Sequence, residues 1–357
     1  MRIAQVCPRY HPHIGGIETH VEEVSERLVQ KGFDVDVLTT DPTGGLPRKD
    51  MLHGVSLMRF SSWAPRDSYY VSCGLKKYLA RNSRSYDVVH AHSYHAFPAL
   101  YSAYAKTKNA LVFSPHYGGT GHTFFRSLLH IPYGYLAGNI FRKADRIVCA
   151  SRYEKSLVMK MFGIGEAKVL IIPSGVNPDE FRPSVMHKND HRSILYVGRL
   201  EKYKGIDYLL KVTQKLNGDV ALRIIGEGPH EKTLMKLADQ LGLRERVTFQ
   251  KHLARAELLQ RYAEADVFIS LSRHEAFGIT VADALASGTP CIVANRSALR
   301  EWIDDENCFG ISYPIDIEEL AQMINSIMGR SVDSTALRLP TWDEAVQKLI
   351  ACYLSLS

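Results

Sequence analysis

The chain has 357 residues, of which 45% are hydrophobic and 23% are charged. This length suffices for two or three domains with their own cores, and the composition is that of an ordinary soluble globular protein. No apolar run approaches the roughly 20 residues that span a bilayer, which excludes a transmembrane helix. The first residues lack the apolar stretch of a signal peptide, so the sequence predicts a cytoplasmic protein.

The net charge of +6 is unevenly distributed. Residues 1–180 contain 22 Lys and Arg against 15 Asp and Glu, whereas residues 181–357 contain 22 against 23. A basic first half favours an anionic partner, such as a membrane surface, an acidic acceptor or a nucleic acid. A solvated surface with an accidental bias explains the charge equally well.

The six cysteines are scattered without a C-x-x-C pair, and most fall in apolar strand or helix patterns. This distribution predicts buried free thiols in a reducing cytosol, ahead of disulfides or a zinc site.

Short apolar, β-branched segments alternate with helical patterns along both halves of the chain. In the first half a helix is predicted at Ile17–Lys31, ended by Gly32. The strands predicted in this half are Arg2–Cys7, Asp34–Thr39, Ser56–Phe60, Val88–His90, Ala110–Ser114 and Arg146–Ala150. Those predicted in the second half are Ser193–Gly198, Ala221–Ile225, Arg246–Gln250, Val267–Leu271 and Cys291–Ala294.

This alternation is typical of doubly wound parallel sheets. The sequence therefore predicts an α/β protein with two Rossmann-like domains that face an interdomain cleft, where ligands bind at the carboxyl ends of the strands. A stretch rich in Pro, Asn and charge, Ser174–Asn189, is the best linker, and Thr341–Leu356 is an amphipathic helix. The expected division is a first domain at 1–175, a linker at 176–192, a second domain at 193–338 and a C-terminal helix at 339–357.

The most informative motif runs from Ser272 to Pro290. Glu275 follows a predicted strand, a helix begins at about Gly278, and Asp283 lies in its second turn. The free backbone N–H groups at a helix start bind anions. Two carboxylates eight positions apart flank these N–H groups. The arrangement suits a ligand that carries both a diphosphate and neutral hydroxyl groups.

Arg199 and Lys204 follow a strand that ends at Gly198. A planar guanidinium and a mobile ammonium together suit a diphosphate. Glycine turns also follow strands at Gly15–Gly16 and at Gly226–Pro229. Such turns let the backbone approach a ligand closely, although a need for turn geometry alone explains them too. The sequence contains no G-x-G-x-x-G dinucleotide fingerprint, which disfavours an ordinary dehydrogenase.

His116 follows another first-half strand, where it can hydrogen-bond a sugar hydroxyl. The neighbouring His90, His92 and His95 raise the question of a metal. Only His90 and His92 share strand alternation, and no carboxylate lies at ligand spacing. We therefore predict no metal site.

Together these segments resemble the retaining nucleotide-sugar glycosyltransferases of family 4, which have the GT-B fold. The resemblance rests on Gly198–Gly205, Gly226–Pro229, Glu275–Ile279 with Asp283, Gly15–Glu18 and Ser114–His116, and it spans about residues 1–310.

The resemblance implies a glycosyltransferase that moves a hexose-type sugar from a nucleoside-diphosphate sugar to a hydroxyl of a glycan or a lipid-linked acceptor, without a cofactor or metal. Implied catalytic residues are His116, Arg199, Lys204 and Glu275. Implied donor-binding residues are Gly15, Gly16, Gly198, Gly226, Gly228, His252, Leu253, Phe277, Gly278, Ile279, Thr280 and Asp283. The last helix would return to the first domain.

One position departs from the family pattern. The family usually has Glu at both ends of E-x7-E, whereas this chain has Asp283 at the second. A side chain one methylene shorter puts the ribose contact or the donor affinity in doubt, not the fold. Two alternatives therefore stay open: an epimerase that converts the donor without an acceptor, and a non-catalytic nucleotide-sugar-binding paralogue.

Two first-half segments bear on the acceptor. Gly74–Arg81 is basic with leucines on one side, and Phe124–Tyr133 is apolar and partly basic. Both suit peripheral docking on the anionic inner face of a membrane, and both suit ordinary core helices with solvated outer faces. The sequence carries no RNA-binding signature, so we expect no nucleic-acid partner.

Overall fold

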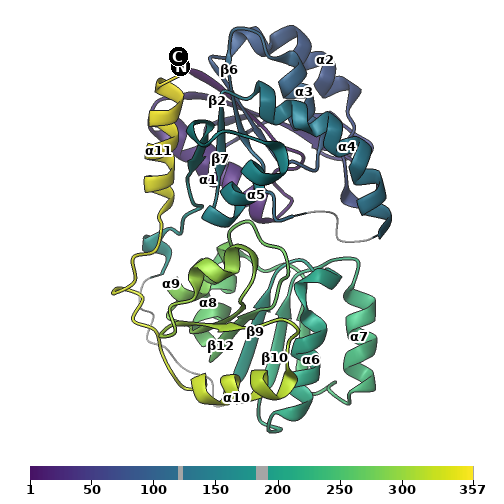
Figure 1. The fold of residues 1–357 in the computed structure, drawn as a ribbon, viewed down its shortest axis with the longest axis vertical. Helices are drawn as coiled ribbons and strands as arrows, with labels where there is room; N and C mark the ends of the chain where they lie inside the picture. Colours follow the sequence, from purple (N-terminus) through teal and green to yellow (C-terminus); the bar gives the residue numbers. More distant parts are fainter. Residues whose placement is uncertain (120–123, 182–191, 357) are drawn as a thin grey trace. The chain divides into compact units, whose positions relative to one another are not determined.

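The computed structural model describes residues 1–119, 124–181 and 192–356, and its chain divides into two compact units (Figure 1). Unit 1 comprises Met1–Ser174 and Trp342–Ser357, and unit 2 comprises Gly175–Thr341. The chain therefore returns to unit 1 for its last helix. Of the expected linker at 176–192, residues 182–191 lie outside the described residues.

Unit 1 contains an eight-stranded sheet in the order β3-β4-β2-β1-β5-β6-β7-β8, in which only the β3–β4 pair is antiparallel. The strand order reverses between β1 and β5, and ligands of open α/β sheets bind at the carboxyl ends of the strands at such a point. The strands are β1 (Arg2–Val6), β2 (Asp34–Asp41), β3 (Lys49–Leu52), β4 (Val55–Ser61), β5 (Val88–His92), β6 (Ala110–Ser114), β7 (Arg146–Cys149) and β8 (Val169–Ile171).

Helices cover both faces of this sheet. Ala4 and Val6 of β1 point into a core shared with α2, α3, α4 and α5, whereas Gln5 between them hydrogen-bonds to α11 on the other face. Helix α11, in yellow, packs against α1 (Figure 1). The helices are α1 (Gly16–Gln30), α2 (Cys73–Asn82), α3 (Phe97–Ala105), α4 (Phe124–Lys143), α5 (Arg152–Phe162) and α11 (Trp342–Leu354).

Unit 2 contains a six-stranded, entirely parallel sheet in the order β11-β10-β9-β12-β13-β14. Its order reverses between β9 and β12, so the loops that follow these two strands occupy the usual ligand-binding edge. The strands are β9 (Ser193–Val197), β10 (Ala221–Ile225), β11 (Val247–Gln250), β12 (Val267–Ser270), β13 (Cys291–Ala294) and β14 (Cys308–Ile311).

Strand alternation divides the core of unit 2 between two layers. Ile194 and Tyr196 of β9 pack with the apolar residues of α6, α7 and α10, whereas Leu195 packs with those of α8 and α9. The helices are α6 (Ile206–Lys215), α7 (Glu231–Gln240), α8 (Arg255–Glu264), α9 (Ile279–Ala286) and α10 (Ile317–Ile327). The predicted fold class, two doubly wound parallel-sheet α/β domains, is confirmed.

Most sequence-predicted elements are present within one or two residues of their expected ends, including the last helix. Three strands escaped prediction: β3, β8 and β14. Strand β3 is a mostly exposed, antiparallel edge strand, so it lacks the apolar pattern of its neighbours. Strand β8 has only three residues, and β14 contains Gly310, which weakens the strand pattern.

All six cysteines are free; Cys73 at the start of α2 is exposed and the other five are buried. Among the residues described by the structure, no helix has both the length and the apolar character needed to cross a membrane.

Candidate active site

The loops that follow β9 and β10 cross at backbone contact. A Cβ atom on Gly226 would lie 2.0 Å from the carbonyl oxygen of Gly198, and one on Gly228 would lie 2.5 Å from that of Leu200. Gly198 and Gly226 also have φ angles of 148° and 139°, which residues with a Cβ atom rarely adopt. These three glycines are therefore required by the fold itself, and their predicted contact with the donor stays a prediction.

Lys204 and Glu275 meet at the end of the adjacent strands β9 and β12. Lys204 ends the short 3₁₀ helix Lys202–Lys204, Glu275 follows β12, and the Lys204 ammonium donates to a carboxylate oxygen of Glu275. Both side chains are mostly buried, with 15% and 21% exposed. Burial opposes the charge of Lys204, but Glu275, helped by Tyr203 and Tyr196, outweighs it and raises the pKa of the ammonium. The pair is thus a fixed cation next to a fixed anion.

Arg199, the second predicted cation, is more exposed. Its guanidinium lies 3.4 Å from Glu201, and 39% of its side chain is accessible. The backbone of the same loop is fixed by the Tyr196 hydroxyl, which donates to the carbonyl oxygen of Arg199 at 3.0 Å. Arg199 can therefore reorient toward a ligand more easily than Lys204.

The predicted anion site at the start of α9 has the expected backbone. Gly278 precedes the helix with φ 99°, and its carbonyl accepts the first helical hydrogen bonds from Val281 and Ala282. The amides of Ile279 and Thr280 thus come before the first hydrogen-bonded turn, where N–H groups are open to an anion. The indole N–H of Trp302 donates to the carbonyl of Phe277 at 2.8 Å and fixes the chain that enters the helix.

Asp283 is held by a residue that the sequence analysis missed. Both carboxylate oxygens accept from Arg255, at 2.8 and 3.0 Å, and Arg255 also donates to Glu180 at 3.0 Å. Asp283 is buried, and a carboxylate has lone pairs for further donors. Contact with ribose hydroxyls would therefore have to share these oxygens with Arg255. Its partner lies 28 residues away, so no local pattern could reveal it.

His252 and Leu253 follow β11. His252 lies 3.2 Å from Glu227, with both side chains more than half exposed, and Leu253 packs against the core beneath α8 and α9. The structure thus places His252 beside the Gly226–Pro229 turn, and contact of either with the donor stays a prediction.

In unit 1, Gly15 and Gly16 begin α1 as predicted. The carboxylate of Glu18 folds over this start: a Cβ on Gly15 would lie 2.5 Å from a Glu18 oxygen. Arg9, which the sequence analysis missed, donates to the same carboxylate at 2.8 Å. The helix start is therefore already close to an anionic group of the chain, which any bound phosphate would have to displace or outcompete.

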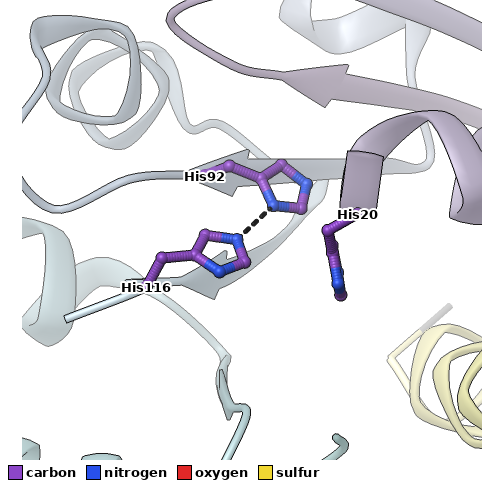
Figure 2. Close-up of side chains that lie close together, drawn as sticks. All are labelled: His20, His92 and His116. Carbon is purple, nitrogen blue, oxygen red and sulfur yellow. Dashed lines mark hydrogen bonds between the residues drawn. The ribbon is translucent and has the colours of Figure 1, made fainter. Parts of the chain in front are cut away.

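His116 follows β6 and is half-buried next to a cluster of buried imidazoles, of which Figure 2 shows His20 and His92. Its φ angle of 49° is left-handed and rare for a residue with a side chain, a strain that concentrates at functional sites. His116 Nε2 lies 3.1 Å from Nδ1 of His92, whose Nε2 lies 2.7 Å from the Gln5 amide oxygen. His20 of α1 borders both rings.

The network continues to the last helix. The Gln5 amide nitrogen donates to the hydroxyl of Tyr353 at 3.4 Å, and Tyr353 lies 2.6 Å from His90 Nδ1, whose Nε2 lies 2.8 Å from the Ser114 hydroxyl. With the Gln5 amide so oriented, its oxygen accepts from His92 Nε2, which leaves the His92 lone pair on Nδ1 facing His116. These proton positions are assigned from the hydrogen-bond network.

Burial lowers the pKa of these imidazoles. The pKa of His20 falls to about 4, and those of His90, His92 and His116 fall well below the usual histidine value, because desolvation disfavours the charged ring. At neutral pH the cluster is therefore uncharged. Three of its members, His20, His92 and His116, lie close enough to share a metal ion. Sequence analysis considered His92 with His90 and His95 instead, because the fold alone brings α1 to the ends of β5 and β6.

The basic segment Gly74–Arg81 lies in α2, and its Leu75 and Leu79 belong to the core of unit 1. Lys76 and Lys77 are exposed on the other side. This arrangement is that of an ordinary core helix with a solvated face. The second segment, Phe124–Tyr133, begins α4, and most of its side chains lie outside the described residues.

Both halves of the chain match models of one enzyme class. Residues 14–180 match the model named Glycosyltransferase Family 4, and residues 177–337 match Glycosyl transferases group 1. The chain is 29% identical to an uncharacterized glycosyltransferase of Methanocaldococcus jannaschii, over 92% of this chain and 89% of that protein. It is 27% identical to the glycogen synthase of Mycobacterium tuberculosis, over 92% and 86% of the two chains.

Solved structures agree in fold. Sucrose-phosphate synthase of Thermosynechococcus elongatus superposes with a TM-score of 0.80 at 20% identity, covering 99% of this chain and 98% of that one. HepE of Anabaena, in complex with UDP-glucose, gives 0.80 at 18% identity, covering 99% and 100%. The chain belongs to the family 4, group 1 glycosyltransferases and has their GT-B fold. It is a glycosyltransferase.

We predict that Gly226→Ala destabilises unit 2 by roughly 2 kcal/mol or more, because the new Cβ meets the backbone of Gly198 and the φ angle is unfavourable. Gly218→Ala is the matched control, since a Cβ there meets nothing within 4 Å. Urea denaturation of both variants measures the difference, and equal midpoints would refute the backbone-contact argument.

We predict that Tyr353→Phe lowers the free energy of unfolding by about 1–3 kcal/mol, because it leaves buried polar groups of Gln5 and His90 without a partner. Tyr104→Phe, at a half-exposed ring in the same unit, should change it by no more than about 0.5 kcal/mol. Thermal unfolding measures both variants. An unchanged free energy of unfolding in Tyr353→Phe would show that the buried network contributes nothing to stability.

Proposed function

We propose that this glycosyltransferase moves a hexose-type sugar, with retention of anomeric configuration, from a nucleoside-diphosphate sugar to a hydroxyl of a glycan or lipid-linked acceptor. The observation that carries the proposal is the mostly buried Lys204–Glu275 pair, which precedes the start of α9 at the strand-order reversal of unit 2. A fixed ammonium and open helix amides at this edge suit a diphosphate.

Known relatives support a nucleotide-sugar donor. HepE of Anabaena, which shares this fold, was solved with UDP-glucose. The donor of the present enzyme is proposed to be of the same class, with its base and sugar left to experiment.

Catalysis in this proposal depends on the charge of the leaving group. As the bond from the anomeric carbon to the β-phosphate oxygen breaks, negative charge develops on the diphosphate. Lys204, Arg199 and the amides of Ile279 and Thr280 are groups of unit 2 that can stabilise it, and preorganised dipoles contribute most to such a step. With these groups in place, transfer is proposed to need no metal.

Retention follows if the acceptor attacks from the face that the diphosphate leaves. The acceptor oxygen bonds to the anomeric carbon, and its proton passes to an oxygen of the departing phosphate. Glu275 is committed to Lys204 and is proposed to hold the ammonium in place and contact sugar hydroxyls rather than act as a covalent nucleophile. His116 is proposed to contact the sugar through its neutral ring.

The proposed acceptor is a glycan or a lipid-linked molecule. Family relatives include glycogen synthase and D-inositol 3-phosphate glycosyltransferases, whose names point to different acceptors. Because the leucines of α2 are buried, docking of this helix on an anionic membrane would rest on its exposed basic side chains, Lys76, Lys77 and Arg81, and not on apolar contacts. Peripheral membrane association therefore stays a prediction.

We predict that one nucleoside diphosphate among UDP, GDP and ADP, or its sugar derivative, stabilises the protein in EDTA. At a concentration 100 times its Kd, such a ligand adds about 2.7 kcal/mol of stability, and a thermal-shift assay measures this directly. The absence of any shift, while a related glycosyltransferase responds in parallel, would favour a paralogue that has lost its donor site. Conversion of the donor sugar without acceptor would identify an epimerase.

We predict that Lys204→Ala lowers kcat/KM by about 100–1000-fold, or about 2.7–4 kcal/mol, because it removes a preorganised cation from the leaving group. Lys202→Ala, an exposed lysine in the same short helix, removes the same charge without touching Glu275 and should retain its rate. Steady-state kinetics with the donor identified above measures both. Equal rates in the two variants would remove Lys204 from the mechanism.

A further inference from the structure

Three histidines from distant parts of the chain converge in unit 1 (Figure 2). His20 comes from α1, His92 ends β5, and His116 follows β6. Each offers one ring nitrogen, and these three atoms lie within 4.8 Å of one another. His20 and His92 are buried. The cluster contains imidazoles alone, without a carboxylate.

His20 gives the strongest indication that the cluster binds a ligand. Its Nδ1 lies 3.1 Å from the hydroxyl of Ser174, but its Nε2 is buried and has no hydrogen-bond partner among the described residues. An unpartnered buried nitrogen is costly, so such an atom in a native protein calls for an explanation. A bound cation at Nε2 would supply one.

The orientation of His92 agrees with this explanation. Its Nε2 is engaged by the Gln5 amide oxygen, which leaves the lone pair on Nδ1 directed at His116. Metal-binding histidines usually have this arrangement: one ring nitrogen is fixed by an outer polar partner, and the other faces the metal. Ser174 plays the same part for His20.

The distances suit a small tetrahedral ion. Two imidazole nitrogens at 2.0–2.1 Å from a shared Zn²⁺ lie about 3.3–3.4 Å apart in tetrahedral geometry. His92 Nδ1 and His116 Nε2 are 3.1 Å apart, so they need only a small separation, while His20 closes in from within 4.8 Å. His116 would bind through Nε2 after its proton moves to Nδ1.

The choice of ion follows from the ligand set. Neutral imidazoles favour zinc and its neighbours, whereas Mg²⁺ and Ca²⁺ prefer oxygen ligands. We propose that His20, His92 and His116 form a binding site for Zn²⁺ that keeps its fourth position open. If His116 contacts the sugar, bound Zn²⁺ competes with the donor and inhibits transfer. This consequence rests on the proposed function.

The test measures zinc directly. The full chain, without a histidine tag and with Cys73→Ser to remove the exposed thiol, competes with a chromophoric chelator for Zn²⁺. We expect equimolar binding. The amide of His20→Asn can keep the Ser174 contact but has no counterpart of Nε2. This variant should lose more zinc affinity than the loss of about 10–100-fold that is typical when only an outer partner is removed. His53→Asn, at an exposed histidine paired with Glu26, should bind as the parent does.

Ser174→Ala is the second variant, in case His20→Asn fails to fold. It removes only the outer partner of His20 and should weaken zinc binding by about 10–100-fold. No zinc binding by the parent, or equal affinity in the parent, Ser174→Ala and His53→Asn, would overturn the proposal. Because binding is read without any sugar donor, this result is independent of whether the proposed transfer reaction is found.

Discussion

The mostly buried ion pair of Lys204 and Glu275 is the interaction on which the proposed chemistry of unit 2 depends. Two charges can remain in a mostly buried place only when each is the partner of the other, so the loops after β9 and β12 are locked together. The parallel sheet explains why they meet, because β9 and β12 are neighbours and both loops leave at their carboxyl ends. A cation held this way needs no rearrangement when charge develops on a leaving group.

The second polar centre is organised differently. In unit 1 the polar groups are neutral, and a chain of hydrogen bonds from Tyr353 through Gln5 to His92 sets which nitrogen faces His116. The last helix thus contributes to the geometry around a predicted catalytic residue, although it follows unit 2 in sequence. His20 borders this network, and its buried Nε2 has no hydrogen-bond partner among the described residues.

Much of the fold could be predicted because its signals are local. The apolar alternation of the strands, the helix that ends at Gly32 and the helix after Glu275 can all be recognised from residues that are neighbours in sequence. The edge strand β3 escaped because an exposed antiparallel strand has no such pattern. The positions of Glu275, Lys204 and Gly278 were also predictable, since strand ends and helix starts define where such residues lie.

The sequence by itself determined the class of fold, the enzyme family and the segments that carry charge to the strand ends. Only the tertiary structure decided which partners these residues take. Arg255 holds Asp283, Arg9 holds Glu18, and Tyr353 reaches His90 across 263 positions. The physical reason is that periodicity fixes the face on which a side chain lies, whereas the register and packing of separate elements fix which side chain it meets.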